Sequence, residues 1–104
     1  MQTTKKTTRH IIHLALDRPA SLPSLKYLLG ANFGGYTLTE GVGGWREGDK
    51  VIQETSYIIT LYDSCFTYEN SDKKVELFCE RVKRLYKQTE IIYTSEQITY
   101  NSIS

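Results

Sequence analysis

The run from Val51 to Tyr62 restricts the fold more than any other part of the sequence, because it is the longest strand candidate. Both its odd and its even positions become apolar in the second half, from Tyr57 to Tyr62. Successive side chains of a strand point to opposite faces, so a strand that is apolar on both faces belongs to a sheet covered on both sides. We expect helices on one face and a neighbouring subunit on the other.

Hydrophobic periodicity predicts the remaining elements around this strand. Leu22, Leu25, Leu28 and Leu29 have helical spacing, and the stretch from Asp72 to Gln88 follows the i, i+3, i+4, i+7 rule most clearly. The predicted strands cover 10–16, 36–40, 51–62 and 90–94, with a short strand or tail at 97–103, and the predicted helices cover 21–29 and 72–88.

The predicted order is therefore β-α-β-β-α-β, which is the ferredoxin-like arrangement of an α+β fold. It places two helices on one face of an antiparallel sheet and leaves the other face open, and a trimer would cover that face. We expect residues 1–8 to form a disordered tail and residues 9–104 to form a single domain, as the length of 104 residues favours.

Charge and apolar content argue against several classes of partner. The 13 Lys and Arg residues nearly balance the 12 Asp and Glu residues, whereas a nucleic-acid-binding domain usually has a clear basic excess. No run approaches the roughly 20 apolar residues that span a membrane, and no signal peptide precedes the first strand. We expect a soluble cytoplasmic protein that binds neither nucleic acid nor membrane.

The two cysteines predict neither a metal site nor a disulfide. Cys65 and Cys79 are isolated from one another in the sequence, which does not make a zinc motif, and disulfides are rare in a reducing compartment. Cys79 falls on the apolar face of the second helix, so we interpret it as part of the core.

Candidate chemical residues gather between the second and third strands. Glu54 lies inside a strand, where a buried carboxylate must be paired or must face a ligand; an exposed edge position is the alternative. Glu40 and Glu47 flank a glycine-rich connection, where they are either an acid–base pair or solvated charges. Trp45, beside Gly41–Gly44, is either an aromatic wall for a cationic or flat ligand or a plug at the end of the sheet.

The two histidines do not form a pair. His10 and His13 have opposite parity in the first strand, so they point to opposite faces. We interpret each as a histidine at the surface or at a strand edge. The sequence supports no Ser-His-Asp or Cys-His arrangement.

Several motifs in order carry a family resemblance. The run Tyr-Thr-Leu-Thr-Glu-Gly-Val-Gly-Gly-Trp (36–45) precedes Val-Ile-Gln-Glu (51–54), and the long helix ends in Tyr-Lys-Gln (86–88) before Glu-Ile-Ile-Tyr (90–93). Over about residues 10–95 the chain resembles trimeric PII-like proteins of ferredoxin-like fold. It is most similar to the phage-encoded S-adenosylmethionine lyases and the related lyases that act on the SAM-AMP conjugate.

The resemblance implies a function and a set of site residues. Members of this family are homotrimers with a nucleotide site at each subunit interface. They cleave the sulfonium C–S bond and release 5′-methylthioadenosine and a homoserine lactone, without a cofactor, as counter-defence enzymes against restriction-modification or type III CRISPR signalling. Glu54 and Gln88 match the family's catalytic glutamate and glutamine, and the candidate substrate-binding residues are Tyr36, Glu40, Trp45 and Tyr57.

Two other functions remain open at this stage. One is a non-catalytic PII-like trimer that binds an adenine nucleotide, although such regulators generally carry a long loop between the second and third strands, and the connection here, about 41–50, is short. The other is an inhibitor that acts on a defence protein by contact alone. A basic group over the site would favour SAM-AMP as the substrate, and Arg9, Arg46, Lys50 and Lys87 are the candidates.

Overall fold

A computed structural model describes residues 1–16, 21–63 and 71–104 of the chain. The element order is β1 (Gln2–Ala15), α1 (Ser21–Asn32), β2 (Thr37–Glu47), β3 (Lys50–Tyr62), α2 (Ser71–Leu85) and β4 (Ile92–Ile103). Neither helix is long and apolar enough to cross a membrane in the part of the chain that the structure describes. Cys65, predicted to be a free cysteine, falls outside the described residues.

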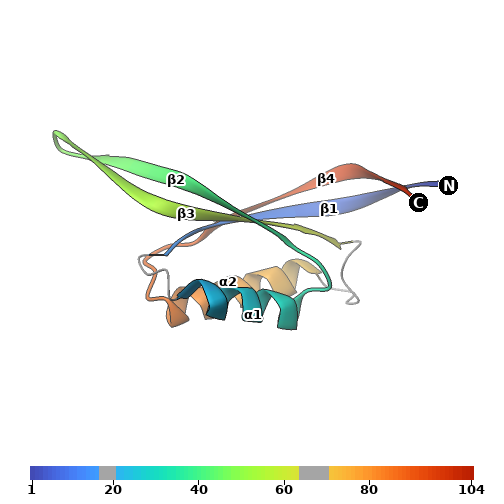
Figure 1. Ribbon diagram of the computed structural model, residues 1–104, viewed down its shortest axis with the longest axis horizontal. Helices are drawn as coiled ribbons and strands as arrows, with labels where there is room; N and C mark the ends of the chain where they lie inside the picture. Colours follow the sequence, from blue (N-terminus) through green and yellow to red (C-terminus); the bar gives the residue numbers. More distant parts are fainter. Residues whose placement is uncertain (17–20, 64–70) are drawn as a thin grey trace.

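The strands form one antiparallel sheet in the order β2-β3-β1-β4, and both helices lie on one side of it (Figure 1). This arrangement confirms the predicted ferredoxin-like fold. We call the side that packs on the helices the covered face; it carries Ile12, Leu14, Ile59 and Leu61. The opposite side is the open face, which carries residues such as His13 and Ile58.

The hydrophobic core lies between the covered face and the helices. Leu25 and Leu29 of α1 and Val75 of α2 are fully buried against the sheet. The rings of Phe33 and Phe78 meet edge to face, with their centroids 5.0 Å apart, and so connect the two helices. Cys79 is buried among these residues, as predicted, and burial raises the pKa of its thiol to about 12.

The first strand begins at Gln2, so the prediction of a disordered tail at residues 1–8 was wrong. Residues from Gln2 to His13 pair with β4, which itself continues without a break from Ile92 to Ile103. These strand ends extend beyond the helices as a two-stranded ribbon (Figure 1). The β1 half of the ribbon, from Gln2 to Thr8, has no apolar residue, so sequence periodicity could not detect a strand there.

The glycine-rich run is also a strand rather than a loop. Gly41–Gly44 belong to β2 and pair with residues 53–56 of β3. Among the described glycines, only Gly48 has a positive φ, 62°, and it forms a two-residue turn with Asp49 between the paired Glu47 and Lys50. The connection between β2 and β3 is therefore a tight hairpin, shorter than predicted.

Candidate functional site

Glu54 and Gln88 line one cavity, although 33 other residues separate them in the sequence. The cavity has a volume of about 180 Å³. It lies on the open face, since Glu54 shares the parity of Ile58, and it sits where β1 ends and β4 begins. The residues that line it are His13, Leu14, Ala15, Glu54, Ser56, Gln88, Glu90 and Ile92.

The strand register leaves space beside Glu54. Its partner across β2 is Gly43, and the partner of Ser56 is Gly41, so β2 places no side chain next to either residue on this face. A Cβ atom at Gly43 would lie 3.4 Å from the Ser56 Cβ and 4.0 Å from the Glu54 Cγ. The glycines thus keep the flank of a half-buried carboxylate accessible.

The end of α2 determines where Gln88 lies. Lys87 adopts a left-handed conformation with φ of 52°. The Gln88 backbone N–H donates to the Lys83 carbonyl at 2.9 Å, and that of Lys87 donates to Arg84 at 3.3 Å, which together make a Schellman motif. The Gln88 amide Nε2 donates to the Tyr86 carbonyl at 3.3 Å. The helix end therefore fixes the backbone and one amide group of Gln88.

The same turn brings a second carboxylate into the cavity. Glu90 follows the helix end and lines the cavity with Glu54. Among the described residues that line it there is no lysine or arginine, so its charged groups are carboxylates. Sequence reasoning missed Glu90, His13 and Ser56, because a glutamate in a connection and a histidine on a strand carry no motif of their own.

Three of the predicted substrate-binding residues lie elsewhere. Tyr36, Glu40 and Tyr57 line a second cavity of about 200 Å³ together with Leu22 and Lys26 of α1. Tyr57 belongs to the buried core and pairs with Glu40, which places this cavity on the covered face. Within one chain, therefore, these residues do not share a cavity with Glu54 and Gln88.

Trp45 lies on the hairpin and lines neither cavity. It pairs with Ile52, whose parity matches that of Glu54, so Trp45 faces the same side of the sheet and is 47% exposed. The four basic candidates do not line the Glu54 cavity either. Arg9 forms an ion pair with Glu96, and the hydrogen bond to that carboxylate raises the pKa of Arg9.

His10 is fully buried, so its interpretation as a surface or edge histidine was wrong. Its Nδ1 lies 2.6 Å from the Ser95 Oγ and its Nε2 lies 2.7 Å from the Asp63 Oδ1. His13 is exposed on the opposite face, as the parity argument predicted. The sequence could not reveal the His10 cluster, because its members lie on β1, after β3 and on β4.

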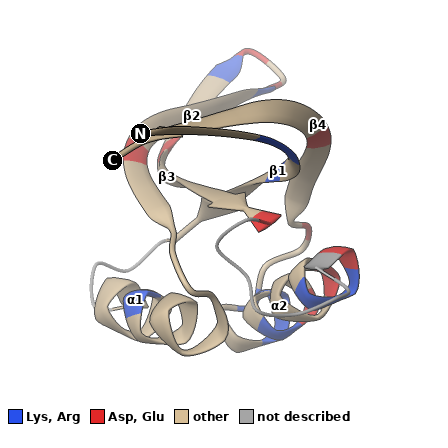
Figure 2. Cartoon of the chain, turned by 90° about the vertical axis from the view of Figure 1, so that its right-hand side faces the viewer, with Lys and Arg blue, Asp and Glu red and all other residues tan. Residues whose placement is uncertain are grey.

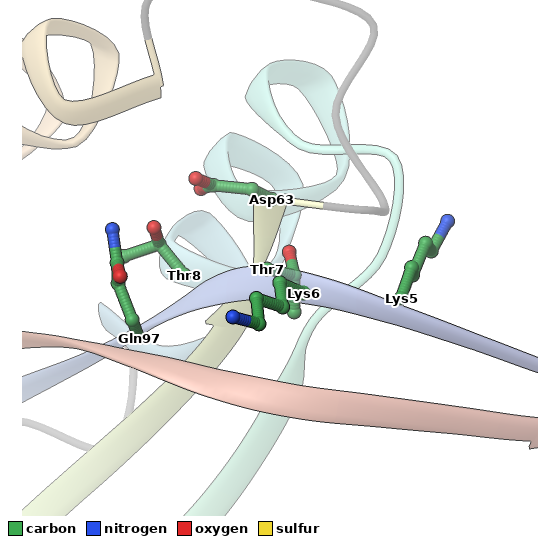
Figure 3. Close-up of a pocket in the computed structure, with 6 residues that line it drawn as sticks. All are labelled: Lys5, Lys6, Thr7, Thr8, Asp63 and Gln97. Carbon is green, nitrogen blue, oxygen red and sulfur yellow. The ribbon is translucent and has the colours of Figure 1, made fainter.

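A larger cavity of about 430 Å³ adjoins this cluster. Figure 3 shows Asp63 above β1, with Thr8 and Gln97 side by side beneath it. Lys5, Lys6 and Thr7 complete the lining. Charged residues of both signs are otherwise spread over the strands and α2 (Figure 2).

Comparison with known proteins shows the fold. No family model and no curated protein matches the sequence. Solved structures with the same fold include a phage SAM lyase in complex with S-methyl-5′-thioadenosine, with a TM-score of 0.58 and 14% identity over 94% of this chain and 90% of that chain. CPII, a nitrogen regulatory PII-like protein from Thiomonas intermedia K12 bound to ADP, AMP and bicarbonate, has a TM-score of 0.56 and 14% identity over 94% and 98%.

CutA from Synechococcus elongatus PCC7942 has a TM-score of 0.61 at 8% identity, over 96% of this chain and 85% of that chain. These identities are too low to transfer an activity, so the comparisons show a PII-like, ferredoxin-like fold. The choice between a lyase and a nucleotide-binding module then rests on the residues of the cavity.

Proposed function

We propose that the protein is a lyase that cleaves the sulfonium C–S bond of S-adenosylmethionine or of its AMP conjugate. The observation that carries this proposal is the common cavity of Glu54 and Gln88, the two residues that match the family's glutamate and glutamine. The phage SAM lyase among the solved structures supports it through the shared fold.

The reaction needs no nucleophile from the protein. The carboxylate of the substrate's methionyl group attacks the carbon that bears the sulfonium, the C–O bond of the lactone forms, and the C–S bond breaks. The products of S-adenosylmethionine are 5′-methylthioadenosine and homoserine lactone; in the AMP conjugate the AMP stays on the half of the substrate that carries it, and the carboxylate must be free to attack. Holding the substrate in this conformation supplies the rate enhancement, and proximity effects of this kind contribute about 7–11 kcal/mol in favourable cases.

The charges of the cavity suit the substrate's positive groups. The sulfonium loses its charge as the reaction proceeds, so a carboxylate held against sulfur would stabilise the substrate more than the transition state. The methionyl ammonium keeps its charge throughout. We therefore assign Glu54 to the ammonium, with Glu90 as a second carboxylate, and Gln88 to orienting the substrate carboxylate.

A homotrimer is part of the proposal because the cavity is incomplete in one chain. A volume of about 180 Å³ is below the roughly 300–1,000 Å³ of pockets that enclose a drug-sized ligand. The open face also lacks covering helices, and residues 2–8 of β1 pair with β4 but not with β3. A second copy would cover this face, and the exposed Trp45, Tyr36 and Glu40 would reach the site only from a neighbouring chain, whereas Tyr57 stays buried in the core.

The proposed biological setting is the cytoplasm of an infected or lysogenic bacterium. Loss of S-adenosylmethionine would deprive restriction-modification systems of their methyl donor, and loss of SAM-AMP would silence type III CRISPR signalling. Either makes the protein a phage counter-defence enzyme.

A nucleotide-binding PII-like module is the second candidate, favoured by the CPII structure with ADP and AMP. The two-residue turn between β2 and β3 argues against it, because PII-like signalling proteins generally carry a long loop there. An inhibitor that acts by contact alone would need no cavity lined by Glu54 and Gln88.

Incubation of the purified protein with S-adenosylmethionine and, separately, with SAM-AMP tests the proposal. Liquid chromatography with mass spectrometry should show methylthioadenosine, or methylthioadenosine that still bears AMP, released from at least one of them. Intact substrate in both reactions would refute the lyase, and thermal shifts with ADP, AMP and ATP would then test the PII-like alternative.

A further inference from the structure

The cluster around His10 has no role in the proposed lyase, and its geometry is that of an activated serine. The His10 side chain is 0% exposed and lies between the Ser95 Oγ at 2.6 Å and the Asp63 Oδ1 at 2.7 Å. The Asp72 Oδ1 lies 3.8 Å from the same ring nitrogen as Asp63. Ser95 itself is exposed on β4, the edge strand of the sheet.

The carboxylate determines the tautomer of His10. An ionised carboxylate only accepts hydrogen bonds, so Nε2 carries the hydrogen and donates it to Asp63. In the neutral imidazole Nδ1 then presents its lone pair, which can accept a hydrogen bond from the Ser95 hydroxyl 2.6 Å away. A nucleophile bonded to a base, which is in turn oriented by a third group, is the arrangement that activates serine in hydrolases and acyltransferases. The triad is recognised by geometry and roles, not by sequence position.

A cavity of suitable size adjoins the cluster at Asp63, although Ser95 and His10 are not among the residues that line it. Its volume of about 430 Å³ is within the range of pockets that hold small molecules. Asp63 and Gln97 both line it (Figure 3). Gln97 follows Ser95 by two residues on the same face of β4, about 7 Å along the strand. Lys5 and Lys6 line the cavity as well, which favours a ligand with a negative charge.

We propose that Ser95 is a nucleophile that accepts the acyl group of a negatively charged carboxylic ester, with His10 as its base and Asp63 as the group that orients His10. The Ser95 Oγ attacks the ester carbonyl while its proton passes to Nδ1. The bond to the alcohol breaks, and the departing alkoxide takes that proton. Water, deprotonated by the same nitrogen, then releases the acid and restores Ser95.

The test uses the mono-4-nitrophenyl ester of succinic acid, with 4-nitrophenyl acetate as its neutral counterpart. We expect a burst of nitrophenol, succinylation of Ser95 in peptide mapping of the wild-type protein, and faster reaction of the anionic ester. Ser95→Ala should lose the adduct at this position. Asp63→Asn, which removes the carboxylate that sets the tautomer, should slow acylation by on the order of 10²-fold or more.

Ser102→Ala is the matched control, because Ser102 is an exposed serine of the same strand with no histidine among the partners that the structure describes. Acylation confined to lysines, or equal in the wild type and Ser95→Ala, would overturn the proposal. The mapping of the wild-type adduct does not depend on any variant folding. Lyase turnover should be unaffected in Ser95→Ala, so the failure of one proposal leaves the other intact.

Discussion

The covered and open faces of the sheet differ in what they contain, even within single strands. In β3, Ile59 is fully buried beneath the helices, whereas its neighbour Ile58 is half-buried on the open face. In β1 the covered face carries Ile12 and Leu14, and the open face carries the exposed His13. The covered face therefore supplies the packing that stabilises the fold, and the open face supplies the Glu54 cavity.

This division explains how the chain tolerates a carboxylate in a central strand. A carboxylate would be costly on the covered face where the helices bury it, as at Ile59 and Leu61. On the open face the glycines of β2 leave Glu54 accessible. The apolar side chains that remain there are what a second copy would bury.

The largest effect on stability is expected when an isoleucine of β3 is replaced by alanine, once on each face of the sheet. Ile59→Ala should lower the free energy of unfolding by about 2–5 kcal/mol, because it removes fully buried methyl groups from a packed core. Ile58→Ala should cost roughly half of that or less in the isolated chain. Denaturant unfolding of both variants measures these free energies, and an unchanged slope m shows that the unfolding transition is comparable.

An equal loss of unfolding free energy in Ile59→Ala and Ile58→Ala would mean that the two faces are equally buried. If the Ile58→Ala loss grows with protein concentration, the open face is buried between copies, because stability then depends on association. Light scattering at micromolar concentration provides the independent measurement, and a monomer there would contradict the trimer.

Glu54→Gln should abolish most lyase turnover, on the order of 10²–10³-fold, while the fold is retained. The amide keeps the shape of the side chain and removes the charge that holds the substrate ammonium. Circular dichroism and the unfolding midpoint should change little, since the position is only half-buried. Full activity would exclude Glu54 from the site.

Glu40→Gln makes the same change on the adjacent strand but on the covered face. A smaller loss of activity than in Glu54→Gln is expected, because Glu40 does not line the Glu54 cavity within one chain. A loss as large as that of Glu54→Gln would mean that the covered-face cavity also takes part in the reaction.

Glu90→Gln should have a smaller effect, roughly tenfold in KM, because Glu54 still holds the ammonium. A tenfold change in affinity corresponds to about 1.4 kcal/mol of binding free energy. Glu80→Gln is the matched control, because Glu80 is exposed on α2 and lines a separate cavity of about 220 Å³ with Glu90 but does not line the Glu54 cavity. Identical kinetics in the two variants would remove Glu90 from the site.

The sequence predicted the elements that have apolar periodicity and missed those that do not. The long helix and the central strand were found because their apolar residues repeat at 3.6 and at 2. The strand through residues 2–8 was missed because it has no apolar residue and is held by backbone pairing with β4, whose residues 97–103 were expected as a short strand or tail. The strand through Gly41–Gly44 was missed because glycine has no side chain from which to read a face.

The candidate site was predicted in part. The resemblance selected Glu54 and Gln88, which the fold brings to one cavity, but Tyr36 and Tyr57 lie on the other face. The cluster of His10, Asp63 and Ser95 was beyond reach, because only the register of β1 with β4 and the end of β3 bring these residues together.

The smallest effect is expected from a thiol reagent on the native protein, because Cys79 is buried in the core next to the covered face. Burial raises the pKa of Cys79 to about 12, so very little thiolate forms at pH 8, and the thiolate is the reactive species. Iodoacetamide should leave Cys79 unmodified in the native protein and alkylate it in denaturant, as peptide mapping will show.

An Ile92→Cys variant provides the open-face comparison, since Ile92 is 55% exposed in the single chain. The proposed trimer predicts slow labelling at position 92 that becomes rapid on dilution, with none at Cys79 in either case. Rapid labelling at position 92 at every protein concentration would mean that no second copy covers the open face.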